Sequence, residues 1–262
     1  MIRVLFIILI FSTSAFARQE FPSERECPPT MEELFSVKET FRYEVKYGFF
    51  KLGWVTVTLL SDSLYQGKSH KHLLTEIESS GIPFVGKELD QFNSLFFVND
   101  DGLPVESVYW KDNVDEEKYD EIRYVFDREA GLVSYKEEDD TRDTLALEEP
   151  ATSGHVIFYF SRLFAGSEEG FKLPVYVTKK AGYIFAENST ETEERRYAAF
   201  EEPVNAYLME GTTEKIEGPF GFSGDFRAWF LDDDLRVPLE ARVKVFLGNV
   251  IVKIIEYNRE DL

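Results

Sequence analysis

Alternation of apolar and polar residues is the dominant pattern along this chain. It is clearest in segment 41–47, FRYEVKY, where every second residue is aromatic or aliphatic and the residues between them are charged. The alternation resumes in segment 55–59, after Gly48 and Gly53. A period of two places alternate side chains on opposite faces of a strand, and glycines inside such a pattern mark bends or bulges. The pattern therefore predicts a strongly curved pair of strands, each with one apolar and one charged face.

Similar signals recur over most of the chain. Alternating or β-favouring stretches, bounded by Gly, Asp, Asn and Pro, predict strands at 72–79, 89–98, 103–110, 120–127, 131–137, 172–179, 182–188, 194–200, 204–217, 225–232, 237–247 and 249–257. A succession of about a dozen strands predicts a mainly β fold, in which a curved antiparallel sheet forms an open or closed barrel or a sandwich.

Two segments have a helical pattern instead. Thr30 is followed three positions later by Glu33, a capping-box arrangement that predicts a short N-terminal helix. In segment 154–165, apolar residues recur at spacings of one, three and four. Ser153 is available as its N-cap and Gly166 follows its end, so we expect one central helix here.

The N-terminus has the features of a secretory signal peptide over residues 1–17. Arg3 precedes an apolar run at 4–11, which is too short to span a bilayer as a stable helix. Ala-Phe-Ala at 15–17 then supplies the small residues that a signal peptidase requires. We therefore expect export to the periplasm or outer envelope of a Gram-negative-type bacterium.

The rest of the chain divides into a leader and one domain. Residues 18–39 read as a leader with the short helix, and residues 40–262 as a single β domain. No later segment resembles a membrane span, so we expect no transmembrane segment after signal cleavage. The only cysteine, Cys27, lies in the leader, so the domain has to be stabilised by its core without an internal disulfide. We expect a monomer.

Composition limits the partners of this domain. The chain has 29 Lys and Arg against 49 Asp and Glu, for a formal net charge of -20. Such a charge repels nucleic acid and disfavours anionic membrane surfaces. The 24 Phe and 13 Tyr provide ample material for a β core.

Candidate chemistry is sparse. His70 and His72 fall on one face of a strand near Glu76, but metal sites usually show more convergent ligands, so a solvent-facing histidine pair is the preferred interpretation. Ser153 lies two residues before His155, yet it is better explained as a helix cap than as a nucleophile. The sequence therefore predicts no catalytic residue, no metal site and no cofactor.

The aromatic residues are the best candidates for a binding site. If the apolar faces of the strands line the inside of a curled sheet, they can enclose an apolar ligand, with the 154–165 helix as a lid or plug. The candidate inner-face residues are Tyr43, Tyr47, Trp54, Phe92, Phe96 and Trp229. The alternative is that these side chains fill a solid core.

Three segments resemble a known family. The opening FRYEVKYGFFKLGWVTV at 41–57, the helical segment 153–162 and the closing WFLDDDLRVP at 229–238 are similar to the exported bacterial proteins grouped as domain of unknown function 3108. The resemblance covers about residues 40 to 257 and implies no established activity. In outline, a curved sheet with a helix is similar to the LolA/LolB lipoprotein carriers, which hold acyl chains in a half-barrel.

Three functions remain open at this point. The first is a non-enzymatic envelope protein that binds a lipid or the acyl part of a lipoprotein inside the sheet. The second is a module that contacts another envelope protein and binds no small molecule, which predicts a filled interior and an exposed apolar patch. The third is an envelope polysaccharide hydrolase, which requires two convergent carboxylates in a cleft.

Overall fold

A computed structural model describes residues 27–80, 88–216, 224–245 and 248–262. The predicted signal peptide and the first part of the predicted leader lie outside these residues. Strands of the N-terminal half are β1 (Val37–Tyr47), β2 (Phe50–Tyr65), β3 (Lys68–Ser79), β4 (Leu89–Val98), β5 (Pro104–Asn113), β6 (Lys118–Asp127), β7 (Leu132–Lys136) and β8 (Arg142–Ala146). Those of the C-terminal half are β9 (Phe171–Val177), β10 (Lys180–Arg195), β11 (Val204–Glu214), β12 (Asp225–Leu231), β13 (Pro238–Val245) and β14 (Gly248–Asp261).

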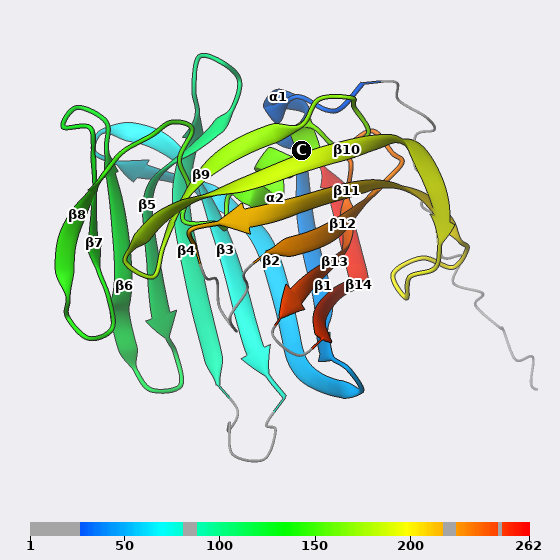
Figure 1. Cartoon of the computed structure of the whole chain (residues 1–262), viewed down its shortest axis with the longest axis horizontal. Coiled ribbons are helices and arrows are strands. Elements are labelled where there is room, and N and C mark those ends of the chain that lie inside the picture. The colour runs from blue at the N-terminus through cyan, green and yellow to red at the C-terminus, as the bar shows by residue number, and fades with distance from the viewer. Residues whose placement is uncertain (1–26, 81–87, 217–223, 246–247) are drawn as a thin grey trace, which may run out of the picture.

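All of these strands belong to one antiparallel sheet. Its order is β8-β7-β6-β5-β4-β3-β2-β1-β14-β13-β12-β11-β10-β9, so each half of the chain forms a meander and the pairing of β1 with β14 joins the two. Figure 1 shows the sheet curling so that β9, β10 and β11 pass across β3 to β6. The predicted mainly β fold with a curved antiparallel sheet is therefore confirmed.

The curled sheet is an open barrel, because its two edge strands, β8 and β9, are not paired with each other. The chain that follows β8 bridges the seam instead. The amide of Glu106 donates to the carbonyl of Ala151 at 3.2 Å, and the amide of Tyr176 donates to the carbonyl of Thr152 at 2.9 Å. Thr152 and Val175 form an isolated parallel bridge. A short connecting segment thus takes the place of a closing strand pair.

Two short helices lie against the sheet. In α1 (Met31–Leu34), the Thr30 hydroxyl accepts from the amide of Glu33, whose carboxylate accepts from the amide of Thr30, so the predicted capping box is confirmed. The central helix is shorter than predicted: it consists of α2 (Ile157–Phe160) and the 3-10 turn η1 (Ser161–Leu163). No helix in the described ranges is long and apolar enough to cross a membrane.

The prediction that Ser153 caps the central helix is wrong. Val156 occupies that position and caps with no side-chain hydrogen bond. The Ser153 hydroxyl donates instead to the carboxylate of Glu106 at 3.1 Å. Ser153 therefore bonds to a buried carboxylate of strand β5, although the local sequence predicts that it caps the helix.

One predicted strand is wrong, and one observed strand was not predicted. The segment 194–200 is not a separate strand, because β10 is one long strand that ends at Arg195, with a register irregularity between Asn188 and Thr192. Strand β8 was not predicted. It is an edge strand whose residues are nearly all exposed, so it carries no apolar alternation that a sequence pattern could reveal.

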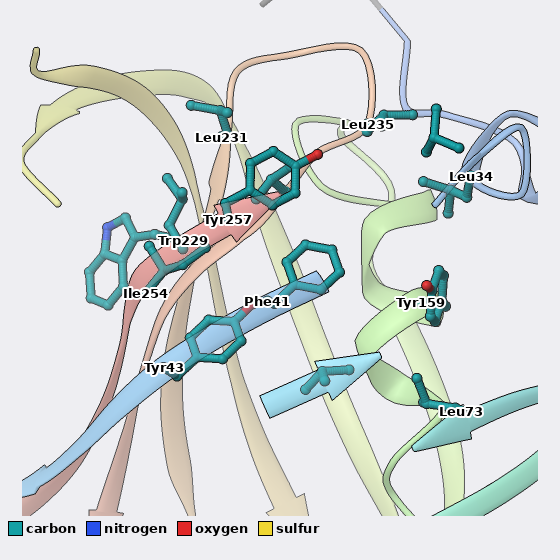
Figure 2. Close-up of a cluster of buried hydrophobic side chains, with 14 of the residues drawn as sticks. Leu34, Phe41, Tyr43, Leu73, Tyr159, Trp229, Leu231, Leu235, Ile254 and Tyr257 are labelled. Carbon is teal, nitrogen blue, oxygen red and sulfur yellow. The ribbon is translucent and has the colours of Figure 1, made fainter. Parts of the chain in front are cut away.

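The helices cover part of the concave face. Tyr159 and Val156 join the largest buried cluster with residues of β1, β3 and β14, while Phe160 packs into a second cluster with β9 to β12. Figure 2 shows Leu34 of α1 and Tyr159 of α2 on one side of the large cluster, with Phe41 and Tyr43 of β1 on the other. The core therefore lies between the helices and the central strands.

Candidate ligand-binding face

The concave face can be identified from the pairing of β1 with its neighbours. Tyr43 lies opposite Val55 of β2 and Ile254 of β14, and all three belong to the cluster under the helices or pack against it. Opposed residues in an antiparallel pair share a face, and successive residues alternate. The odd-numbered residues of β1 therefore point inward, and the even-numbered ones point outward.

A buried ion pair connects the helical plug, which consists of α2 and η1, to the sheet. The Nη1 and Nη2 atoms of Arg162 lie 2.8 and 3.1 Å from the two carboxylate oxygens of Glu39 on β1, with the side chains 0% and 1% exposed. The hydroxyl of Tyr257 on β14 donates to the same carboxylate at 2.7 Å, and Nε of Arg162 donates to the carbonyl of Leu235 at 2.8 Å. Burial and the nearby Glu39 carboxylate raise the pKa of the Tyr257 hydroxyl well above its ordinary value.

The loop between β12 and β13 closes over this ion pair. Arg236 is fully buried, with Nε donating to the carbonyl of Ala165 at 3.2 Å and Nη1 bonded to Asp232 at 3.2 Å. One oxygen of Asp233 accepts from the amide of Val237, while its other oxygen is buried without a hydrogen-bond partner among the described residues. Burial raises the pKa of this carboxyl to about 7, although Arg162 opposes the rise. Arg236, Arg162 and Asp233 are all 0% exposed, so these contacts hold the loop against the plug inside the protein.

A second buried carboxylate secures the entry to α2. Glu106 on β5 accepts hydrogen bonds from the amide and hydroxyl of Ser153 and, at 3.3 Å, from the hydroxyl of Thr152. Burial raises the pKa of Glu106 to about 7, and these hydrogen bonds limit the rise. The carboxylate thus holds the seam segment against β5.

His155 lies where the filled part of the interior ends. Its ring stacks against both Phe92 and Tyr109, with both centroid distances 5.1 Å and interplanar angles of 20° and 24°. Burial lowers the pKa of this imidazole to about 4, so the ring is neutral at pH 7. The side chain nonetheless keeps part of its surface exposed. It therefore presents an uncharged aromatic surface on the concave side.

The rest of the concave face is apolar and only partly covered. Strand β1 has 11 residues and spans about 36 Å, whereas the seven residues of α2 and η1 span roughly 10 Å. The helix therefore cannot cover the full length of the strands. Partly exposed apolar residues on the concave side are Tyr47, Val55, Ile77, Phe92, Ile122, Phe158, Phe226, Ala228, Ala241, Val243 and Val252.

Four of the predicted site residues do lie on the concave side, in two different environments. Tyr43 and Phe96 are buried in the core, and the Tyr43 hydroxyl donates to the carbonyl of Pro238 at 2.9 Å. Tyr47 and Phe92 keep part of their surface exposed. The first two therefore serve packing, as the solid-core alternative predicted, and the last two belong to the partly open surface.

The inner-face prediction for Trp54 is wrong. Trp54 lies opposite Glu44, one residue out of phase with Tyr43 and Val55, and so belongs to the outer face. Its ring carries the ammonium of Lys51 at 3.9 Å and the guanidinium of Arg42 at 5.8 Å. Such cation–π contacts place the indole among the charged residues of the convex surface.

The inner-face prediction for Trp229 is also wrong. Trp229 lies opposite Glu240, which in turn lies opposite Lys253 on the outer face of β14. The guanidinium groups of Arg195 and Arg242 lie 4.1 and 5.0 Å from the ring centroid. In Figure 2 the indole lies on the far side of the cluster from Tyr159. The ring is nonetheless only 4% exposed and belongs to the same buried cluster as Tyr43, so it serves packing.

The prediction of a solvent-facing histidine pair is wrong for His70, whereas His72 is partly exposed. His70 is buried, with Nε2 2.8 Å from the Ser107 hydroxyl and Nδ1 3.0 Å from the carbonyl of Lys68. His72 contacts Asn93 through Nε2 at 2.9 Å. Within the part of the chain that the structure describes, no group of three or more His, Cys, Asp or Glu residues could hold a metal ion.

The comparisons with known proteins agree with this fold. A family described as "Protein of unknown function (DUF3108)" matches residues 42–255. The crystal structure of a β-barrel-like protein of domain of unknown function DUF1849 from Brucella abortus is similar with a TM-score of 0.50 and 9% sequence identity, over 86% of this chain and 98% of that chain. At this identity the likeness concerns the fold alone. No curated protein matches the sequence.

Proposed function

Since the chain belongs to the DUF3108 family of proteins of unknown function, its role has to be inferred from its own surfaces, and we propose that it holds an apolar ligand on the concave face. The ligand class is a lipid or the acyl part of a lipoprotein. The proposed role is non-enzymatic, and the proposed compartment is the periplasm or outer envelope, as the signal-like N-terminal sequence predicts.

The observation that carries this proposal is the partly exposed apolar surface beside α2. Exposed apolar area on a concave surface costs free energy in water, at about 25 cal/mol per Å². Val55, Ile77 and Val252 line adjacent strands of this surface, and the neutral ring of His155 extends it toward β5. An acyl chain removes such surface from water without requiring a charged partner.

The charged residues at the edge of the concave face favour a ligand whose bound part is uncharged. Lys111 shares the concave side with Phe92, but it is already surrounded by carboxylates of Asp90, Glu121 and Glu138 at 3.0 to 3.7 Å. A hollow of about 450 Å³ on the outer side of β11 to β14 is lined mainly by charged residues and offers no comparable apolar surface.

The direct test is native mass spectrometry of the protein purified gently from its own envelope fraction, followed by organic extraction. We expect a stoichiometric lipid to travel with it. An empty monomer that also fails to take up a fluorescent fatty acid would overturn the proposal and favour the protein-interaction module.

A matched pair of variants locates the ligand. Val55 and Thr56 are adjacent, both half-buried, and on opposite faces of β2. We expect Val55→Asn to weaken fatty acid uptake by about tenfold, because an unpaired amide then faces the apolar chain. Thr56→Asn should leave uptake unchanged. Equal losses in both variants would contradict a site on the concave face.

A further inference from the structure

The turn between β1 and β2 exposes two large aromatic side chains. Phe49 is 104% exposed and Phe50 is 67% exposed. The start of β14 lies beside this turn, since Tyr47 pairs with Val250, and the end of β13 pairs with the start of β14. Figure 1 shows the end of β1, the start of β2, the end of β13 and the start of β14 at the same edge of the sheet. An open hollow of about 350 Å³ between the turn and the start of β14 is lined by Tyr47, Gly48, Phe49, Phe50, Gly248, Asn249 and Ile251.

The same strand ends are cationic in an otherwise acidic protein. Segments 45–61 and 241–255 contain no Asp or Glu, although the whole chain has a net charge of -20. Their five cations, all at least one-third exposed, are Lys46, Lys51, Arg242, Lys244 and Lys253. In the structure they pair with only three carboxylates, those of Glu44, Glu240 and Asp225. Positive charge is therefore in excess around the exposed phenylalanines.

We propose that this end of the sheet, formed by the β1–β2 turn and the adjoining ends of β13 and β14, binds the surface of an anionic lipid bilayer. Phe49 and Phe50 enter the interface between headgroups and acyl chains, and the lysines that flank them contact lipid phosphates. Aromatic rings that protrude next to lysines are typical of residues that enter a membrane interface. A bilayer can accommodate such rings because it is deformable and needs no preformed pocket.

The overall negative charge does not prevent this contact. At physiological ionic strength the Debye length is about 8 Å, so carboxylates at the far end of the sheet are screened from the membrane surface. The local excess of cations then decides the sign of the interaction. The expectation from net charge alone, which disfavoured anionic membranes, applies to the rest of the surface.

The test is co-sedimentation of the purified protein with vesicles of phosphatidylcholine, with and without phosphatidylglycerol. We expect binding to the mixed vesicles, at least about tenfold tighter than to phosphatidylcholine alone, and weakened by salt. The double variant Phe49→Ser and Phe50→Ser should lose about tenfold or more in affinity for the mixed vesicles.

The matched control is Leu64→Ser. Leu64 is 79% exposed near the β2–β3 turn, at the opposite end of β2, and its loss should leave vesicle binding unchanged. Absence of binding by the unmodified protein, equal binding by the double variant, or an equal loss in Leu64→Ser would overturn the proposal. Fatty acid uptake by the double variant should equal that of the unmodified protein, which separates this surface from the concave face.

Discussion

The guanidinium of Arg162 and the carboxylate of Glu39 form a two-bond ion pair inside the protein, between residues 123 positions apart in the sequence. The pair connects the 3-10 turn after α2 to the first strand of the sheet. Its Tyr257 and Leu235 contacts extend the connection to β14 and to the β12–β13 loop. The helical plug is therefore held by polar contacts as well as by packing.

Arg162→Met should destabilise the protein by about 3–5 kcal/mol, because the Glu39 carboxylate is left buried without its counter-charge. Urea denaturation measures the free energy of unfolding. The double variant Arg162→Met with Glu39→Leu should recover much of this loss. A loss in the double variant as large as in the single one would show that packing, and not the unpaired charge, dominates.

The stability contributed by Glu106 should fall as pH rises. Its folded-state pKa of about 7 is above the ordinary value of 4.5, so the folded protein binds a proton that the unfolded chain has released. The contribution is complete below about pH 4.5 and is lost as pH rises to about 7, by roughly 3 kcal/mol. Glu106→Gln should remove this part of the pH dependence in urea titrations between about pH 4 and pH 8. An unchanged pH profile would contradict the raised pKa.

The three tryptophans should respond little to a ligand on the concave face. Trp54 and Trp229 lie on the outer face, and Trp110, one residue from the inward-facing Tyr109, lies there too. Adding a fatty acid should therefore leave tryptophan emission nearly unchanged, whereas a Phe92→Trp variant should show a blue shift. A strong response of the unmodified protein would place the ligand on the convex side.

Gly53→Ala should be more damaging than Gly102→Ala. A Cβ added at Gly53 would lie 1.9 Å from the carbonyl oxygen of Glu78 on the neighbouring strand, while one at Gly102 meets nothing within 4 Å. We expect a loss of about 1–3 kcal/mol at Gly53 from forced separation of β2 and β3. Gly102 has φ of +78°, so its variant should lose about 1 kcal/mol from backbone strain. Thermal and urea unfolding of both variants compare the two effects.

Much of the fold could be predicted from local pattern. The strand 89–98 was placed at its observed bounds, and the capping box at Thr30 and Glu33 has both of its hydrogen bonds. These signals act over a few residues, so they survive in any tertiary context. Strand β8 escaped prediction because an exposed edge strand has no apolar face to reveal it.

The candidate site was only partly predictable. Alternation correctly put Tyr43 and Tyr47 on one face, but it did not say that helix α2 covers the first and leaves the second partly exposed. Aromatic character alone assigned Trp54 and Trp229 to the interior. Both rings instead stack with cations on the outer face of the sheet. Trp54 is partly exposed there, whereas Trp229 is 4% exposed and packs into the large buried cluster.

By itself, the sequence determined most of the strands, the mainly β class and the division of these strands into an apolar and a charged face, because these follow from a period of two. The tertiary structure alone decided which face curves inward and how far the short central helix covers it. It also decided that Glu39 meets Arg162 and that Glu106 meets Ser153. Such pairs join residues far apart in the chain, and their energies depend on burial that no local pattern encodes.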